Sequence, residues 1–300
     1  MNKTQEESKQ QIKLGLSWNV IGLFVNKGAS IIVRLVLARL LVPEDFGVIA
    51  MITVVLGLIG ILCDFGLKNA LIQRSDERAA GSTYDSVFWL LLCGGFFWTA
   101  LFMIAGIPLM LMVFDESGLV DLALIMGLVI PLQSSVVVPE ARLIRDMHFK
   151  SLVTAEMAST LSASILAISM AFAGFGVWSL VVHELSANLL RTGLIWRFAR
   201  WRPTMRFSWE PLRELAGFSR YMLGNQLIHY ARTNMDRALI GAILGTASLG
   251  VYTLAFMLTE TIRSRITGMV SRVMFPVYSR LQHDKGEVAR LIFRLSGTQR

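Results

Sequence analysis

The stretch 215–244 is long enough to cross a bilayer as a helix, since about 20 apolar residues suffice, but polar side chains interrupt it. Asn225, His229, Arg232 and Asp236 follow an i, i+4, i+7, i+11 spacing. At about 100° per residue they form one narrow stripe on a helix. A charge in hydrocarbon costs roughly 2.5–3.5 kcal/mol, so we expect the stripe to face a bundle interior or a water-filled cavity. The alternative is an interfacial or soluble helix.

A second polar stripe is predicted in 16–41, near the N-terminus. Asn19, Asn26, Lys27 and Arg34 fall within roughly 100° of arc on a helix. Both stripes carry more basic than acidic side chains. A cavity lined in this way favours an anionic ligand over a cationic one, because lysine and arginine offset negative charge.

The composition indicates an integral membrane protein. Hydrophobic residues make up 54% of the 300-residue chain and charged residues 17%, against about 25% charged in soluble domains. The net charge of +8 is concentrated in loops on one side of the expected helices, which argues against a nucleic-acid partner. No CxxC, HExxH, GxxxxGK[ST] or GxGxxG motif occurs, so we predict no metal site and no cofactor. Cys63 and Cys93 lie in apolar runs and are expected to be small buried residues.

About eight apolar segments are expected to span the membrane, and they are 16–41, 47–67, 87–114, 119–138, 152–173, 177–196, 215–244 and 249–273. The connections without Lys or Arg are 42–46, 115–117, 174–176 and 245–248. The N-terminal tail, the C-terminal tail and the remaining connections are basic. This asymmetry predicts an all-α, multi-pass topology with both termini in the cytoplasm.

The chain also contains a weak internal repeat. Shifted by 203 positions, Arg34 meets Arg237, Leu41 meets Leu244 and Gly47 meets Gly250. We therefore predict a complete lobe of six transmembrane helices at 1–200 and the start of a second lobe, with two transmembrane helices and an amphipathic tail, at 215–300. Residues 201–214 form the expected cytoplasmic linker. Transporters commonly bind their substrate between such repeats.

Several motifs, taken in their order along the chain, resemble a known family. They are ARLLVPEDFGVIAM (38–51), DFGLKNALIQR (64–74), VPEARLIRDMHF (138–149), GFGVWSLV (174–181), MDRALIGAILGTASLGVYTLAF (235–256) and FPVYSRLQ (275–282). The chain resembles the polysaccharide-transporter branch of the multidrug/oligosaccharidyl-lipid/polysaccharide superfamily, the O-antigen and exopolysaccharide flippases. The resemblance implies two six-helix lobes plus a terminal helix pair. Because family members run on for about six more helices, we expect the second lobe to be incomplete in this chain.

The resemblance further implies alternating access between the lobes and movement of an undecaprenyl-diphosphate-linked oligosaccharide across the bacterial inner membrane. Membrane lipids, a polysaccharide polymerase and glycosyltransferases are the other expected partners. Arginine and lysine suit phosphate, and side-chain amides suit sugar hydroxyls. The predicted substrate-binding residues are Lys27, Arg34, Arg232, Arg237, Asn26, Asn225 and Gln226, with His229 and Asp236 as ion-coupling candidates.

Alternatives remain open for these residues and for the whole chain. Arg232 and Asp236 are also spaced as an i, i+4 ion pair, and His229 could be a hydrogen-bonded core residue. The chain could belong to a cation-coupled multidrug exporter of the same superfamily, or be a truncated membrane fragment without transport activity. A membrane enzyme such as a glycosyltransferase is less favoured, because no DxD motif is present.

Overall fold

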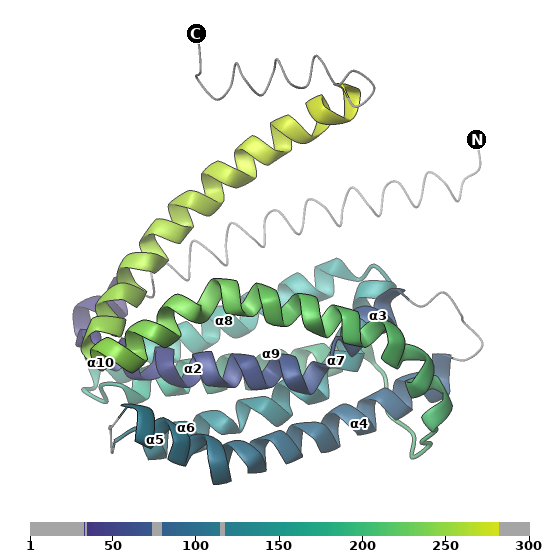
Figure 1. The fold of residues 1–300 in the computed structure, drawn as a ribbon, viewed down its shortest axis with the longest axis horizontal. Helices are drawn as coiled ribbons and strands as arrows, with labels where there is room; N and C mark the ends of the chain where they lie inside the picture. Colours follow the sequence, from purple (N-terminus) through teal and green to yellow (C-terminus); the bar gives the residue numbers. More distant parts are fainter. Residues whose placement is uncertain (1–32, 34, 74–79, 115–117, 282–300) are drawn as a thin grey trace. The chain divides into compact units, whose positions relative to one another are not determined.

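The computed structural model describes residues 33, 35–73, 80–114 and 118–281, and every regular element within them is a helix (Figure 1). After a helical stretch at 35–40, the elements are α2 (Pro43–Asp64), α3 (Leu67–Gln73), α4 (Ala80–Leu101), the π-helical turn η1 (Phe102–Gly106), α5 (Ile107–Phe114), α6 (Leu119–Gly127), α7 (Val129–Arg145), α8 (Phe149–Phe172), α9 (Trp178–Ala199) and α10 (Trp209–Leu281). The predicted all-α fold is confirmed.

Five helical stretches are long and apolar enough to cross a membrane: Pro43–Asp64, Ser82–Met112, Leu119–Arg145, Phe149–Phe172 and Leu212–Met257. α9 has 22 residues and is not among them. It carries Glu184, Arg191 and Arg197, which lower its hydropathy. These helices define a polytopic membrane protein.

Prolines and glycines explain the irregular points in the long helices. Pro108 lacks an amide hydrogen and crowds the carbonyl four residues earlier, which belongs to η1, the turn that joins α4 to α5. Gly245, within the expected connection 245–248, interrupts α10 with φ 80° and ψ −177°, a conformation that is available essentially to glycine alone. α10 is thus two helices that meet at Gly245.

The chain divides into two compact units, Met1–Thr253 and Leu254–Arg300, and α10 runs from the first into the second. All the contacts described below lie within the first unit. The second unit continues α10 to Leu281.

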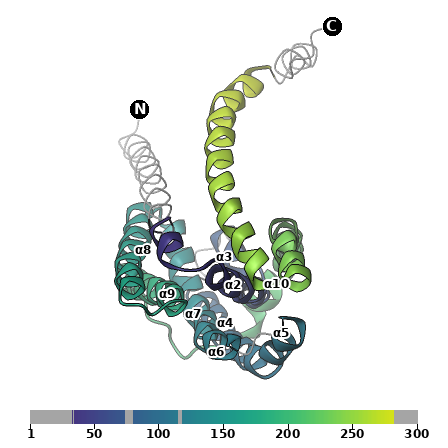
Figure 2. The same ribbon diagram turned by 90° about the vertical axis from the view of Figure 1, so that its left-hand side faces the viewer.

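Within the first unit, α10 packs closely along α2, and Figures 1 and 2 show the two helices side by side. The Tyr230 hydroxyl donates a hydrogen bond of 2.5 Å to the Val54 carbonyl. This approach requires Gly57, because a Cβ there would lie 2.6 Å from the Tyr230 hydroxyl. Small residues at a helix contact permit such packing, which is the main source of helix association in lipid.

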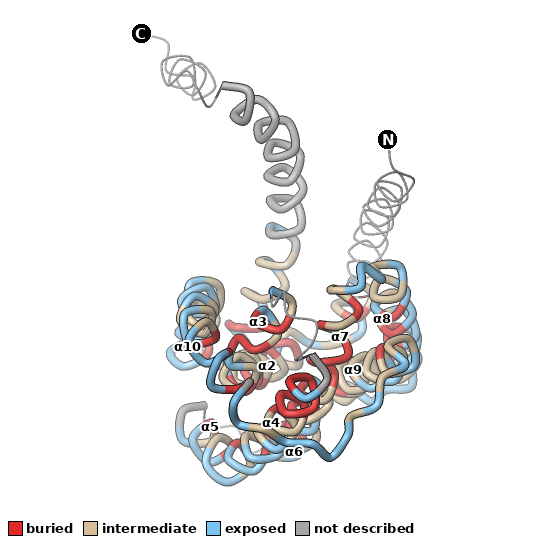
Figure 3. Tube along the Cα trace, turned by 90° about the vertical axis from the view of Figure 1, so that its right-hand side faces the viewer, coloured by how far each residue is buried: buried red, intermediate tan, exposed pale blue. Residues whose placement is uncertain are grey.

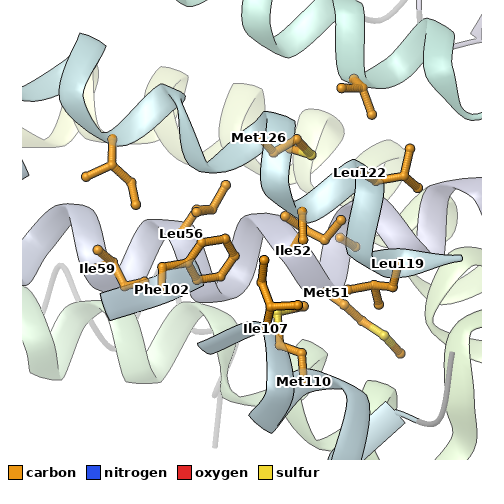
Figure 4. Close-up of a cluster of buried hydrophobic side chains, with 14 of the residues drawn as sticks. Met51, Ile52, Leu56, Ile59, Phe102, Ile107, Met110, Leu119, Leu122 and Met126 are labelled. Atoms are coloured by element: carbon orange, nitrogen blue, oxygen red, sulfur yellow. The ribbon is translucent and has the colours of Figure 1, made fainter. Parts of the chain in front are cut away.

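Apolar side chains fill the bundle around α2 in two clusters. One cluster joins α2 to η1, α5 and α6, with Ile52, Phe102 and Met126 almost completely buried (Figure 4). A second cluster joins α3, α4 and α7 to the start of α10. In Figure 3 the outer turns of α8 and α10 are largely intermediate or exposed, as expected for helices whose outer sides meet lipid or another surface.

One sequence expectation about the core is wrong. Cys63 is buried and its thiol lies 3.1 Å from the Ser134 hydroxyl, but Cys93 is exposed. Hydropathy does not separate a lipid-facing position from a core position, because both favour apolar side chains.

Candidate functional site

The polar stripe predicted on 215–244 lies mainly on the outer side of α10. Asn225, His229 and Arg232 are exposed, and so are the neighbouring Ile228 (72%) and Met235 (58%). The interior of the described bundle is therefore excluded as the environment of these three polar side chains. A water-filled or polar surface is the remaining environment that avoids placing arginine in hydrocarbon.

Gln226 lies beside this stripe on the same helix and reaches towards α2. Its side chain hydrogen-bonds the Asp64 carboxylate, while its Oε1 atom is buried without a partner among the described residues. Asp64 also accepts the Lys68 amide at 3.3 Å, so it caps the start of α3. Gln226 thus contributes to the contact between α2 and α10.

Asp236 connects the two parts of α10 across the break at Gly245. Its carboxylate accepts a hydrogen bond from the Tyr252 hydroxyl and another, of 2.9 Å, from the Arg237 amide. No ion pair joins it to Arg232 in the described part of the chain. Arg237 is partly buried and takes part in another interaction besides the bond from its amide to Asp236.

The polar stripe predicted on 16–41 is the other half of the expected site. Asn26, Lys27 and Arg34 lie outside the described residues. The convergence of the two polar stripes on one cavity therefore stays a prediction.

The structure adds a network of ion pairs that was not predicted. The Glu140 Oε1 atom lies 2.8 Å from the Lys68 ammonium and 2.9 Å from an Arg191 terminal nitrogen. Arg191 also donates from Nε to Glu156 at 2.8 Å. Glu140 is the most buried member, with 12% of its side chain exposed, against 27% for Arg191 and 51% for Glu156.

The network connects α3, α7, α8 and α9 and has no formal net charge. A carboxylate in an apolar helix needs a partner, because an unpaired charge at membrane depth is costly. Glu140 within the apolar run of α7 was therefore a signal that a basic residue elsewhere would approach it. The position of Glu140 in the sequence could not identify Lys68 and Arg191 as its partners, because they lie on other helices.

Polar contacts continue from this network along α7 and α9. Gln133, seven residues before Glu140, donates to the Asn188 side chain at 3.2 Å. Asn188 in turn donates to the Glu184 carboxylate at 3.0 Å. Since helical residues seven apart share a face, these contacts and the ion pairs form one polar seam between the two helices.

An aromatic cluster lies where α9 ends and the segment 200–208 begins. This segment connects α9 to α10 and is called the linker below. The Phe88 ring contacts Trp196 and Trp201 edge-on, with centroid distances of 5.6 Å in both pairs. Trp196 and Trp201 are stacked at 5.9 Å. The Arg142 guanidinium carbon lies 5.6 Å from the Tyr84 ring centroid and 5.8 Å from that of Trp201.

Hydrogen bonds hold the linker to α4 beside this cluster. The buried Asp85 carboxylate accepts bonds from the Thr204 amide, at 3.0 Å, and from the Thr204 hydroxyl. The Trp89 indole donates to the Thr204 carbonyl at 2.9 Å, and the Ser208 amide donates to Ser86 at 2.9 Å. The linker is thus packed against α4 as part of the first unit.

These features define a polytopic helical membrane protein with a polar seam between its helices. The family model of polysaccharide biosynthesis proteins matches residues 36–298, and the chain belongs to this family. Its resemblance to polysaccharide transporters is confirmed.

Named relatives agree with this assignment. The chain is 28% identical over 290 residues to the succinoglycan biosynthesis transport protein ExoT of Rhizobium meliloti (strain 1021), covering 94% of this chain and 56% of the relative. It is 24% identical over 289 residues to the lipopolysaccharide biosynthesis protein WzxC of Escherichia coli (strain K12), covering 94% and 57%. It is 26% identical over 234 residues to the teichuronic acid biosynthesis protein TuaB of Bacillus subtilis (strain 168), covering 76% and 47%. The chain thus spans about half the length of these relatives, and no solved structure matches it.

Proposed function

We propose that this chain acts in the transfer of a lipid-linked oligosaccharide, carried on undecaprenyl diphosphate, across the bacterial cytoplasmic membrane. The observation that carries the proposal is the family match over 36–298 of a helical membrane bundle. A relative named as a succinoglycan biosynthesis transport protein supports the transport role.

The physical task explains which side chains such a protein needs. Transfer breaks no covalent bond, but a diphosphate and several sugars must pass the hydrocarbon layer. Arginine and lysine can replace the hydration of phosphate oxygens, and amides can replace that of sugar hydroxyls. Exposed basic and amide groups on a transmembrane helix, as on the outer side of α10, suit this task.

We assign the cationic lining to Lys27, Arg34, Arg232 and Arg237, and the sugar contacts to Asn26 and Asn225. Gln226, which bonds Asp64 of α2, is left out of this lining. His229 and Asp236 are the candidates for coupling to an ion. Alternating access would move the two lobes relative to each other around this lining.

Complementation tests the proposal directly. The 300-residue chain is expressed in a bacterium that lacks its own polysaccharide flippase, and surface polysaccharide is measured. Restoration is expected, with a loss of about tenfold or more in Arg232→Gln, because a charge-assisted hydrogen bond contributes about 1.5–3 kcal/mol. Arg220→Gln is the matched control, since Arg220 is another exposed arginine of α10 and its guanidinium lies over the neighbouring Tyr221 ring.

The outcomes separate the alternatives. If the chain inserts normally and restores nothing, it does not transport on its own. If it restores no polysaccharide but confers drug resistance, the multidrug exporter is favoured. Equal restoration by Arg232→Gln and the unaltered chain would remove Arg232 from the substrate path.

A further inference from the structure

Four arginines outside the ion-pair network lie against the aromatic cluster or next to its tryptophans in the chain: one contacts two of its rings, and three are chain neighbours of Trp196 or Trp201. We call them the arginine rim. The rim consists of Arg142 near the end of α7, Arg197 in the last turn of α9, and Arg200 and Arg202 in the linker.

Contacts hold the rim in place. The Arg142 guanidinium lies over the rings of Tyr84 and Trp201. Arg200 and Arg202 are the chain neighbours of Trp201, whose ring is stacked on Trp196. The hydrogen bonds between Thr204 and Asp85 fix the following turn of the linker. The Arg142 side chain and the linker backbone are thus held in place, which lowers the ordering entropy that ligand binding costs at the rim.

The rim has no acidic partner in the described part of the chain. Asp85 is occupied by Thr204, and Glu140 is shared by Lys68 and Arg191. Asp146, at the end of α7, is exposed and forms no ion pair with Arg142 among the described residues. Lys68 and Arg191 are therefore neutralised by carboxylates, whereas no described carboxylate pairs with the rim.

The dipoles at the C-termini of α7 and α9 explain the presence of only two of the four rim arginines. Arg142 and Arg197 lie in the last turns of α7 and α9, where basic residues stabilise the helix. Arg200 and Arg202 lie beyond the last residue of α9 and are exposed. These two exposed cations are thus open to an anionic ligand.

Tryptophan rings show where the rim would lie in a membrane. Trp89, Trp196 and Trp201 are all partly buried in the cluster. Tryptophan is enriched at the level of lipid headgroups, and basic pockets at this level bind anionic headgroups. We propose that the arginine rim binds the phosphodiester headgroup of an anionic phospholipid, such as phosphatidylglycerol.

Native mass spectrometry of the whole purified chain, titrated with phosphatidylglycerol or phosphatidylcholine in detergent, tests this proposal. Each basic residue near an anionic lipid surface contributes about 1 kcal/mol, or about fivefold in affinity. Arg200→Gln/Arg202→Gln should therefore weaken phosphatidylglycerol binding about 25-fold. Arg200→Lys/Arg202→Lys should keep most of the binding, because the charge remains.

A charge-matched control removes two other exposed arginines, Arg39 and Arg220, by substitution with glutamine. This variant should change phosphatidylglycerol binding less than about twofold, since neither residue belongs to the rim. Three results would each overturn the proposal: an equal loss in the control, equal binding of phosphatidylcholine, or displacement of the lipid by inorganic phosphate. The last result would identify a site for soluble anions. The tested arginines are exposed, and circular dichroism of the variants checks that folding is retained.

Discussion

The backbone of Gly47 in α2 lies against that of Gly250 in α10, and the two residues are 203 positions apart. A Cβ on Gly47 would lie 1.9 Å from the Thr246 carbonyl oxygen, and a Cβ on Gly250 would lie 1.8 Å from that of Pro43. Pro43 and Thr246 are separated by the same 203 positions. Reciprocal contacts between equivalent residues are the signature of a two-fold relation.

This contact predicts that neither glycine accepts a larger residue. In Gly47→Ala or Gly250→Ala the new methyl group meets backbone atoms, which cannot rotate away. We expect a loss of about 1–3 kcal/mol or more in unfolding free energy, as for other overpacked sites. Gly224→Ala is the matched control on α10, where a Cβ meets nothing within 4 Å. It should stabilise the helix by up to about 1 kcal/mol. Thermal unfolding in detergent measures all three, and an unchanged Gly250→Ala protein would contradict the packing argument.

Glu140 should be the most sensitive member of the ion-pair network. Glu140→Gln leaves Lys68 and Arg191 without their shared carboxylate. Removing one partner of a fully buried pair costs about 3–5 kcal/mol, and the partial exposure here reduces our expectation to about 1–3 kcal/mol. Glu156→Gln is the control, expected to cost below about 1 kcal/mol because its side chain is 51% exposed. Equal melting temperatures for the two variants would argue against a central role for Glu140.

The Tyr252 hydroxyl should stabilise the break in α10. In Tyr252→Phe, Asp236 loses the donor that connects it across Gly245. We expect a loss of about 1–3 kcal/mol, because a polar group is left without its partner. Tyr221→Phe removes the same atom from an exposed ring on α10 and should be close to neutral. Thermal unfolding compares the pair, and a neutral Tyr252→Phe would show that water or another group replaces the hydroxyl.

Asp85 should control how firmly the linker is docked. Trypsin cleaves after arginine unless proline follows. Arg200 and Arg206 are therefore its exposed sites in the linker, whereas Arg202 precedes Pro203. Asp85→Ala removes the acceptor of both Thr204 bonds, so limited trypsin digestion should cut the linker several-fold faster. Thr204→Val keeps the amide bond and should produce a smaller increase. Asp121→Ala, on the exposed side of α6, should leave the cleavage rate unchanged. Equal rates in all variants would show that these bonds do not hold the linker.

Local properties of the chain explain what could be predicted. Hydropathy and segment length predicted a helical membrane protein, and Gly245 lies within the short connection expected at 245–248. The 203-residue repeat rested on few identities, yet it pairs Gly47 with the residue that it contacts in the structure. The helices and the break at Gly245 depend on residues that are close in sequence. The repeat depends on similar residues that recur 203 positions apart.

Tertiary structure decided which polar residues meet and which face outward. Periodicity placed Asn225, His229 and Arg232 on one stripe, but the packing of α10 against α2 turned that stripe away from the bundle. The partners of Glu140 come from α3 and α9, far away in sequence, and only the three-dimensional arrangement of the helices brings them within 3 Å. The sequence by itself thus determined the membrane class, the helices from α2 onward and the stripe on α10, because these follow from local hydropathy and helical period. The ion pairs, the docked linker and the arginine rim depend on how separate helices pack, which no local pattern records.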